Sequence, residues 1–473
     1  MRICCAILIA VAWLGGCGGQ PLQPWHTAKL SSEFTVDMAD QVQSFEDYLT
    51  LEDRLFDELQ AKVYAEVGTG PEYALVRYSS GSAADPDTRP PNRNRSFELK
   101  PEDPLGGILL LHGLTDSPYT LHDLGEKLHE MGYWVIGLRI PGHGTAPSAL
   151  KTVRWRDMAA AVKIGMDHLV KRVGDKPVHI VGYSNGATLA LDLVLNSIDD
   201  PEARMPASLI LISPSIGISA AAALARPTAA VGRIPGLTSV GWAQTTPEFD
   251  PYKYNSFPVN GGAQVHQLTR SVSSRVSSLE RAGNGGIMPP ILVFKSAVDA
   301  TVTTDAVVDL LLARLPDNGN ELVLFDINRH AGASILLVSD PGPLTNRLVA
   351  DASLPFALTV IGNESAESAK IVARHKAPFA ADFTSTESLN MEWPRGVISL
   401  SHVALPFATD DPLYGQFPPE DRNKLFLGQM EIRGERGLLK ISSDWLLRIR
   451  YNPFYSAMED RVLEWLNSAK LSR

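Results

Sequence analysis

The sequence lacks several signatures that would assign it to common binding or catalytic classes. It contains no run of lysine and arginine, and its 43 basic and 53 acidic residues give a net charge of −10, so we expect no nucleic-acid partner. The phosphate-binding pattern Gly-x-x-x-x-Gly-Lys-Ser/Thr, a Gly-x-Gly-x-x-Gly pattern after a strand and the zinc pattern His-Glu-x-x-His are all missing. His122 and His129 share one face of an expected helix. We therefore expect neither a cofactor nor a metal.

Cysteine is scarce, and all of it lies near the N-terminus. The three cysteines occupy positions 4, 5 and 17. Arg2 precedes an apolar stretch over 3–14 that is too short to cross a bilayer as a stable helix. The residues Leu14-Gly15-Gly16-Cys17 resemble the lipobox of bacterial lipoproteins, in which the cysteine is acylated and becomes the new N-terminus. The alternative is an ordinary secretory signal that holds a cysteine there by chance.

The lipobox resemblance implies an export and anchoring route. Cleavage before Cys17 would leave a single cysteine, so no intramolecular disulfide could form. We expect 1–16 to be a lipoprotein signal peptide, Cys17 to be the lipidated residue and 17–35 to be a tether. The residue after the cysteine is Gly18 rather than aspartate, which in Gram-negative lipoproteins indicates the outer membrane. The expected location is therefore the cell envelope, with a lipid anchor in the outer membrane.

The full sequence of 473 residues is long enough for one large domain with insertions. A helical apolar pattern from Val36 to Val63 predicts a helix packed on the main domain. Residues 79–95 are rich in Ser, Pro, Asn and Asp, which is typical of a loop. We expect an N-terminal helical and loop region over 36–104 and a main domain over 105–473.

The main domain is organised around a serine in a sharp turn. A β-branched run, Val178 to Val181, leads into the pattern Gly-x-Ser-x-Gly, and a run of small residues with helical character follows. A strand–turn–helix of this kind forces Ser184 towards strained backbone angles, so Gly182 and Gly186 must be small. The turn presents the hydroxyl at the positive end of a helix, which suits a nucleophile.

Buried strands alternate with helices around this turn, and this alternation predicts an α/β fold. It indicates a mostly parallel sheet with helices on both faces. The expected strands are 108–111, 133–140, 178–183, 209–213, 290–294 and 321–327, and the expected helices include 152–172 and 186–197.

Three motifs in this order resemble the α/β-hydrolase fold, near its monoglyceride-lipase, carboxylesterase and serine aminopeptidase S33 branch. They are Leu-His-Gly-Leu-Thr-Asp-Ser-Pro over 111–118, Pro-Gly-His-Gly-Thr over 141–145 and Gly-Tyr-Ser-Asn-Gly over 182–186. Asp116 stands where those relatives often have glycine. The resemblance covers roughly 105–215 and 290–330.

The resemblance implies an oxyanion hole after the first expected strand. Attack on an ester carbonyl creates an oxyanion, and we expect the backbone N–H groups of Leu114 and Asn185 to stabilise it. His112 and His143 are expected to shape their loops, since each lies beside glycine in a turn.

The acid of the expected triad should follow the strand 290–294. Asp299 lies before a short spacer and Val302, as in the acid loop that the resemblance implies. Asp305 opens the next expected helix, where an acidic residue is favourable in any case. We therefore predict Asp299 as the residue that orients the histidine.

Two histidines compete as the base. His330 lies 31 residues after Asp299, just beyond a core strand, where the fold usually presents its base. His402 ends an apolar run, and Ser401-His402-Val403-Ala404-Leu405 looks like the stretch around the base in related carboxylesterases. We predict His402 and keep His330 as the alternative.

Two insertions complete the expected domain. Residues 216–289 are expected to form a cap above the active site. A β-containing insertion over 331–450 is expected to hold strand-like runs at 356–361 and 397–400 and a hairpin over 427–441. The helical spacing of Tyr455, Met458, Val462 and Leu466 predicts a final helix.

These features together predict a membrane-anchored serine hydrolase that cleaves carboxylic esters through an acyl-enzyme. Its expected substrate is an acylglycerol, a lysophospholipid or a similar acyl ester. Two alternatives remain: a peptidase or amidase on the same triad, and a catalytically silent lipoprotein that binds an acyl ligand.

Overall fold

The computed structural model describes most of the chain, from residue 21 to residue 471. The described ranges are 21–217, 241–299, 301–331, 340–421, 424–428 and 449–471. The predicted signal peptide and the predicted lipidation site Cys17 lie outside these ranges. Among the helices within them, none has the length and apolar character needed to cross a membrane.

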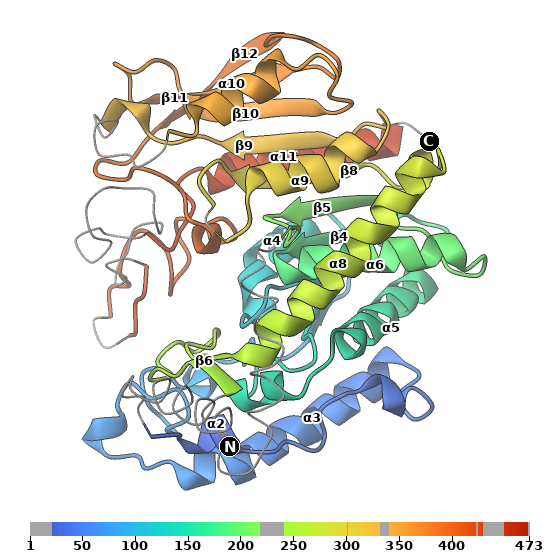
Figure 1. The fold of residues 1–473 in the computed structure, drawn as a ribbon. Coiled ribbons are helices and arrows are strands. Elements are labelled where there is room, and N and C mark those ends of the chain that lie inside the picture. The colour runs from blue at the N-terminus through green and yellow to red at the C-terminus, as the bar shows by residue number, and fades with distance from the viewer. Residues whose placement is uncertain are drawn as a thin grey trace, which may run out of the picture.

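A ten-stranded sheet forms the centre of the molecule (Figure 1). Its strand order is β1-β3-β2-β4-β5-β8-β9-β10-β11-β12. The strands from β3 to β10 run parallel, whereas β1, β11 and β12 pair antiparallel with their neighbours. The bounds are β1 Phe97–Leu99, β2 Gly107–Leu111, β3 Trp134–Leu138, β4 Val178–Tyr183, β5 Ser208–Ile212, β8 Ile291–Ser296, β9 Glu321–Phe325, β10 Ala357–Asn363, β11 Lys370–Lys376 and β12 Ser385–Glu392.

Helices cover both faces of this sheet, as the sequence predicts. Alternate residues of β2 enter two separate apolar clusters: Leu109 and Leu111 join one, and Ile108 and Leu110 join the other. The first cluster includes residues of α5, α6, α8, α9 and α10, and the second includes residues of α4 and α11. The bounds are α4 His122–Glu130, α5 Trp155–Val173, α6 Asn185–Asp199, α8 Val259–Arg281, α9 Thr304–Leu310, α10 Gly342–Ala350 and α11 Tyr455–Leu471.

The N-terminal region packs on the main domain, and two predictions about it were wrong in detail. The helix expected from Val36 begins at Phe45 instead: α3 spans Phe45–Lys62, because the Ser44 side chain caps it by accepting from Asp47 N. Residues 24–34 do not form the predicted free tether. They include the short helix α2 (Pro24–Thr27), and Trp25 and Phe34 are buried against the body. The lower part of Figure 1 shows α2 and α3, of which α3 lies beside α5.

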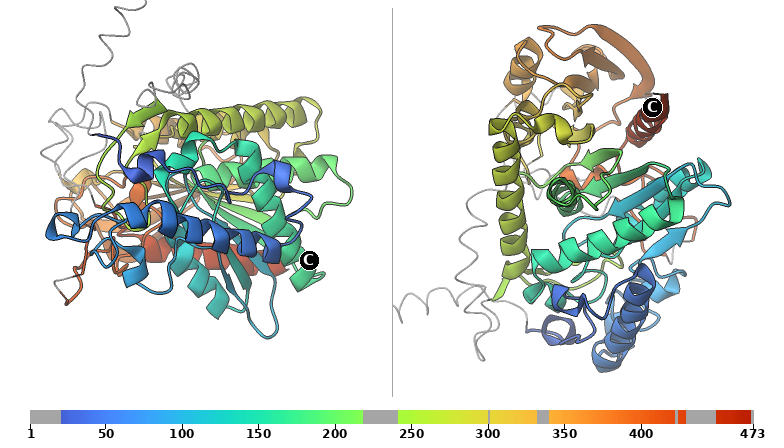
Figure 2. Two further views of the ribbon diagram at one scale, coloured as in Figure 1. Left: turned by 90° about the horizontal axis from the view of Figure 1, so that it is seen from below. Right: turned by 90° about the vertical axis from the view of Figure 1, so that its right-hand side faces the viewer.

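Part of the predicted cap belongs to the helical layer of the fold. The helix α8 is the crossover between β5 and β8, which are adjacent parallel strands and therefore need such a connection. It packs against α6 at an angle (Figure 2). Before it, β6 (Trp242–Gln244) and β7 (Phe257–Pro258) form a small separate sheet.

The C-terminal extension enlarges the sheet. The predicted run 356–361 forms β10, which pairs parallel with β9, and β11 and β12 extend the sheet beyond it. The predicted strand over 397–400 was wrong, because β10 already occupies the place beside β9. The run instead crosses the end of the sheet as a loop, with Ile398 O accepting from Asn328 N at 2.7 Å. Most of the predicted hairpin lies outside the described residues.

Candidate active site

Ser184 lies at the sharp turn between β4 and α6, in the conformation that its neighbours permit. Its backbone angles are φ 53° and ψ −113°, a region that residues other than glycine rarely adopt. A Cβ on Gly182 would approach the Ala187 Cα to 2.5 Å, and one on Gly186 would approach the Leu111 carbonyl oxygen to 2.1 Å. Gly186 therefore allows the turn to lie against β2, and Gly182 allows the first turn of α6 to lie against β4.

The structure brings together the three residues predicted as the triad. Nε2 of His402 lies 3.1 Å from Oγ of Ser184, and Nδ1 of His402 lies 2.8 Å from Oδ2 of Asp299. All three side chains are buried or nearly so. The imidazole can accept a proton from the serine hydroxyl while its other N–H faces a carboxylate, which is the geometry of nucleophilic serine catalysis.

The two competing candidates lie elsewhere. His330 is exposed, and its Nδ1 lies 3.4 Å from the Ala366 carbonyl oxygen. Asp305 is exposed in the first turn of α9, where it forms an ion pair with Arg347. Neither makes a recorded contact with Ser184 within the described ranges.

Asp299 has a buried partner that the sequence analysis missed. Lys295 on β8 donates to Oδ2 of Asp299, and the backbone N–H groups of Thr301 and Val302 donate to Oδ1 at 2.8 and 3.0 Å. Burial alone would raise the pKa of Asp299, but the charges and hydrogen bonds of His402 and Lys295 hold it below its ordinary value. The carboxylate is therefore ionised at neutral pH. A lysine inside an apolar strand, four residues before an acidic residue, was the available signal.

The loop that carries His402 is fixed to the sheet by hydrogen bonds. Oγ of Ser296, at the end of β8, donates to the Leu400 carbonyl oxygen at 2.9 Å. The Tyr183 hydroxyl donates to the His402 carbonyl oxygen at 3.3 Å. Ser215, a further residue that sequence reasoning missed, places its Oγ 3.0 Å from Oγ of Ser184. The hydroxyl of Ser184 thus has two partners, the imidazole of His402 and the hydroxyl of Ser215.

The predicted oxyanion loop follows β2 and is held by the segment before α8. The Tyr254 N–H donates to the Thr115 carbonyl oxygen at 2.8 Å, and Lys253 forms an ion pair with Asp116. This pair gives Asp116 a cationic partner from the segment before α8. Within the described part of the chain, the backbone N–H groups of Leu114 and Asn185 have no intramolecular acceptor. Both are therefore available to a substrate oxygen.

His112 and His143 lie in the loop-shaping positions expected for them. Ile140 N donates to Nε2 of His112 at 3.0 Å, so Nδ1 carries the proton and donates to the Gly113 carbonyl oxygen at 2.9 Å. Burial lowers the pKa of His112 well below its ordinary value and lowers that of His143 to about 4. Both imidazoles are therefore neutral at pH 7.

One group of side chains in the described residues has the spacing of a metal site. The ligand atoms of His122, Asp123 and Glu126 on α4 lie within 4.8 Å of one another. Glu126 also pairs with Arg93 at 3.5 Å, and His129 is not a member, since its Nδ1 faces the Tyr133 carbonyl oxygen. The group is separate from the Ser184 site.

Comparison with known proteins agrees with this arrangement. Residues 102–332 match the family described as serine aminopeptidase, S33. A thermostable monoacylglycerol lipase of Bacillus sp. (strain H-257) is 29% identical over 197 residues, which cover 41% of this chain and 71% of that protein. The match to the family contains Ser184 and Asp299 and ends before His402.

Solved structures of lipolytic enzymes overlap about half of the chain. One reported for the metagenome-derived enzymes LipS and LipT is 20% identical, covers 50% of this chain and 88% of that chain, and has a TM-score of 0.39. The monoacylglycerol lipase of Paleococcus ferrophilus is 17% identical, covers 49% and 87%, and has a TM-score of 0.37. The sheet, the motifs and the family match together show that this chain has the α/β-hydrolase fold, and that residues 102–332 are similar to the branch that holds the S33 serine aminopeptidases and the monoglyceride lipases.

Proposed function

We propose that the protein is a serine hydrolase that cleaves carboxylic esters through an acyl-enzyme. In this mechanism Ser184 attacks the carbonyl carbon, His402 takes the hydroxyl proton and returns it to the leaving alcohol, and Asp299 orients the imidazole and stabilises its cation. Water then repeats the sequence and releases the acid. The observation that carries the proposal is the pair of contacts of His402, 3.1 Å to Ser184 and 2.8 Å to Asp299.

The backbone supplies the charge stabilisation that the mechanism needs. The oxyanion formed on attack would accept hydrogen bonds from the N–H groups of Leu114 and Asn185. One such donor contributes about 10²–10³ in rate. The ion pair between Asp116 and Lys253 holds the loop that carries Leu114 in place.

The substrate class rests on the relatives. The name of the Bacillus relative favours an acyl ester such as a monoacylglycerol, whereas the S33 description favours a peptide or an aminoacyl amide. We propose the ester, because that relative aligns directly over 197 residues. An amidase on the same residues is the second candidate, since the triad does not fix the leaving group.

We also propose that Cys17 anchors the protein to a membrane through acyl chains. The support is the stretch Leu14-Gly15-Gly16-Cys17 and the absence of any later cysteine in the sequence. Several acyl chains give firm attachment, since each buried methylene contributes about 0.8 kcal/mol. An acyl ester substrate would then be drawn from the lipid surface at which the protein is held.

The proposal is tested with a fluorophosphonate probe and a substrate panel. The wild-type protein should be labelled with one probe per chain, and Ser184→Ala should abolish labelling, because only an activated serine reacts. Ser215→Ala is the matched control, because Ser215 is the neighbouring hydroxyl, and it should still be labelled. A panel of nitrophenyl acyl esters and aminoacyl amides then separates the two candidates. Full labelling of Ser184→Ala would overturn the assignment of the nucleophile.

A further inference from the structure

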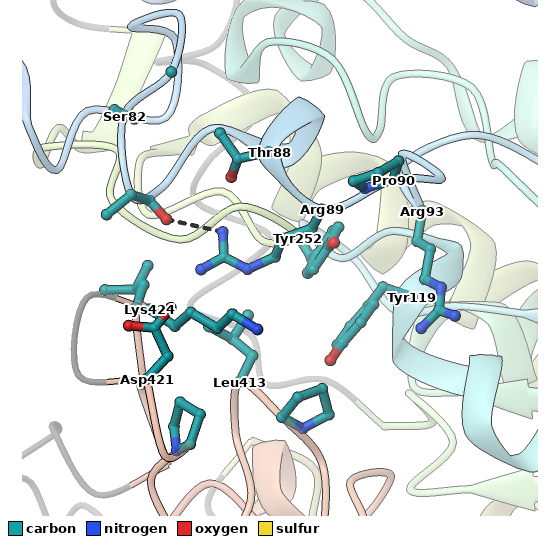
Figure 3. Close-up of a pocket in the computed structure, with 15 residues that line it drawn as sticks. Ser82, Thr88, Arg89, Pro90, Arg93, Tyr119, Tyr252, Leu413, Asp421 and Lys424 are labelled. Carbon is teal, nitrogen blue, oxygen red and sulfur yellow. Dashed lines mark hydrogen bonds between the residues drawn. The ribbon is translucent and has the colours of Figure 1, made fainter.

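A cavity lies beside the loops that carry the candidate active site. Its volume is about 580 Å³, within the range of small-molecule sites. One wall is the loop 81–93, and Tyr119 and Tyr252 lie between it and the opposite wall (Figure 3). The opposite wall consists of residues of the C-terminal extension: Pro412, Leu413, Pro419, Asp421, Lys424 and Leu425. Tyr119 follows the oxyanion loop by a few residues. This cavity does not include Ser184.

Positive charge gathers in this cavity without a matching carboxylate. Arg89, Arg93 and Lys424 line it, and Asp421 is the one carboxylate among the described residues that do so. Arg93 is paired with Glu126 at 3.5 Å. In the described ranges no carboxylate lies within ion-pair distance of Arg89 or Lys424, and the recorded partner of the Arg89 guanidinium is the Ala83 carbonyl oxygen at 2.8 Å. Two cations therefore remain available to an anion.

The two cations approach each other from opposite walls. Figure 3 shows the guanidinium of Arg89 reaching inward from the loop 81–93 and the side chain of Lys424 reaching inward from the segment below it. An anion between them would receive charge-assisted hydrogen bonds, which are about twice as strong as neutral ones. A carboxylate or phosphate oxygen fits this position.

The floor of the cavity is aromatic and apolar. The rings of Tyr119 and Tyr252 stack with centroids 4.0 Å apart and an interplanar angle of 7°, and Leu413 and Leu425 join them. The Tyr119 hydroxyl is engaged, since it donates to Asp411 at 3.0 Å. Tyr252 is 3% exposed, and its hydroxyl has no recorded hydrogen-bond partner within the described residues. It is a donor left free on a wall of the cavity.

We propose that this cavity is a binding site for an amphiphilic anion, a molecule that bears a carboxylate or phosphate on an apolar or aromatic body. Arg89 and Lys424 bind the anionic group, the Tyr252 hydroxyl donates to it, and the apolar body packs on Tyr119, Leu413 and Leu425. The site goes beyond the proposed ester hydrolysis, because none of these residues takes part in the triad.

Isothermal titration calorimetry with three probes tests this site on the full-length protein. The probes are naphthalene-2-carboxylate, its neutral isostere naphthalene-2-carboxamide, and inorganic phosphate. The carboxylate should bind about tenfold or more tightly than the amide, because only the carboxylate engages both cations. Inorganic phosphate should bind more weakly than the carboxylate, because it lacks the apolar body. Equal affinity for carboxylate and amide, or phosphate binding as tight as the carboxylate, would overturn the proposal.

Charge-removing variants locate the site. Arg89→Gln and Lys424→Gln should each weaken carboxylate binding about tenfold and leave amide binding unchanged. Lys424 is exposed, so its substitution does not endanger folding. Lys370→Gln removes another exposed lysine, on β11, and is the matched control, with no expected effect. Unchanged carboxylate affinity in both cavity variants would show that the anion binds elsewhere.

Inhibition kinetics identify the source of the natural anion. If naphthalene-2-carboxylate competes with 4-nitrophenyl butyrate and Lys424→Gln relieves the competition, the cavity holds part of the substrate or the acid product. If the probe binds without competing, the occupant is a separate ligand. Both patterns support the site. Because calorimetry needs no turnover, a failure of the proposed hydrolysis would not be mistaken for a failure of this site.

Discussion

Lys295 donates a hydrogen bond to Oδ2 of Asp299, the same oxygen that accepts from His402. Both side chains of this ion pair are fully buried. A buried carboxylate is costly unless it is paired and hydrogen-bonded. The lysine therefore allows Asp299 to stay ionised when His402 is neutral, before any proton has moved from Ser184.

The first prediction concerns this lysine. The folded pKa of Asp299 lies below its unfolded value, so its contribution to stability is present above about pH 4 and is lost as the pH falls further. Lys295→Met should lower the free energy of unfolding at pH 7 by about 3 kcal/mol, because it leaves the buried carboxylate of Asp299 without its cationic partner while His402 is neutral. The decrease in the free energy of unfolding from pH 5 to pH 3, measured by urea unfolding, should be smaller in the variant than in the wild type.

Lys376→Met is the control for this experiment. Lys376 is also buried, but its ammonium donates to the Asp351 carbonyl oxygen at 2.9 Å and pairs with no carboxylate within the described residues. Its removal should cost about 1 kcal/mol, the contribution of an ordinary hydrogen bond, without changing the acid-side slope. Equal effects of the two variants would contradict a special role for Lys295.

The second prediction concerns Asp411, whose pKa is raised to about 7. Burial is the main cause and the charge of Asp123 adds to it, while hydrogen bonds from Tyr414 and Leu413 oppose it. Because the folded pKa exceeds the unfolded one, folding favours the protonated form, and the free energy of unfolding should fall as the pH rises from about 4 to 7. The fall attributable to this group is up to about 4 kcal/mol.

Asp411→Asn should remove this fall, because the amide keeps an acceptor for the backbone N–H groups and carries no charge. Urea unfolding of both proteins at several values between pH 4.5 and pH 8 measures it. The variant should gain stability relative to the wild type as the pH rises. A constant difference across this range would show that Asp411 does not titrate there.

The third prediction concerns the turn that carries Ser184. Gly186→Ala should destabilise the protein by several kcal/mol or prevent folding, because the new Cβ would meet the Leu111 carbonyl oxygen at 2.1 Å. Gly262→Ala on α8 is the control, since its nearest neighbour lies at 3.5 Å and alanine favours a helix by roughly 0.5–1 kcal/mol. Thermal unfolding compares them. A stable, active Gly186→Ala protein would contradict the close packing of the turn.

The fourth prediction concerns the anchor. Cys17→Ala should move the protein from the membrane fraction to the soluble fraction and abolish palmitate incorporation, because Cys17 is the proposed acylated residue. Cell fractionation and radiolabelled palmitate measure the two effects. The control is Ser184→Ala, because Ser184 lies far from Cys17 in the sequence. This variant should stay in the membrane fraction. A membrane-bound, unlabelled Cys17→Ala protein would mean that another feature holds it there.

Much of the fold could be predicted because its core obeys local rules. Residues 108–111 and 209–213 are continuous apolar runs, and such runs are buried strands when turns and helices bound them. The turn at Ser184 was predictable for the same reason, since the pattern Gly-x-Ser-x-Gly stands between an apolar run and a run of small residues. These features need no knowledge of distant residues.

The features that the sequence analysis missed depend on distant residues. The run 397–400 has the composition of a strand, but β10 is the strand that pairs with β9. The segment 24–34 resembles a tether, yet Trp25 and Phe34 find apolar partners from elsewhere in the chain. The pairing of Lys295 with Asp299 could have been predicted, because the two residues are four positions apart. The cavity that Arg89 and Lys424 line could not, because these residues are more than 300 positions apart in the sequence.

A comparison of variants at His402 and His330 tests the proposed triad most directly. Ester hydrolysis is measured for His402→Ala and His330→Ala, with circular dichroism to show that each variant is folded. We predict that His402→Ala loses turnover by several orders of magnitude, up to roughly 10⁶, because the nucleophile loses its base. His330→Ala should keep near-normal turnover, since its exposed side chain contacts neither Ser184 nor Asp299 within the described residues. Near-normal turnover of folded His402→Ala together with an inactive His330→Ala would contradict the proposed triad.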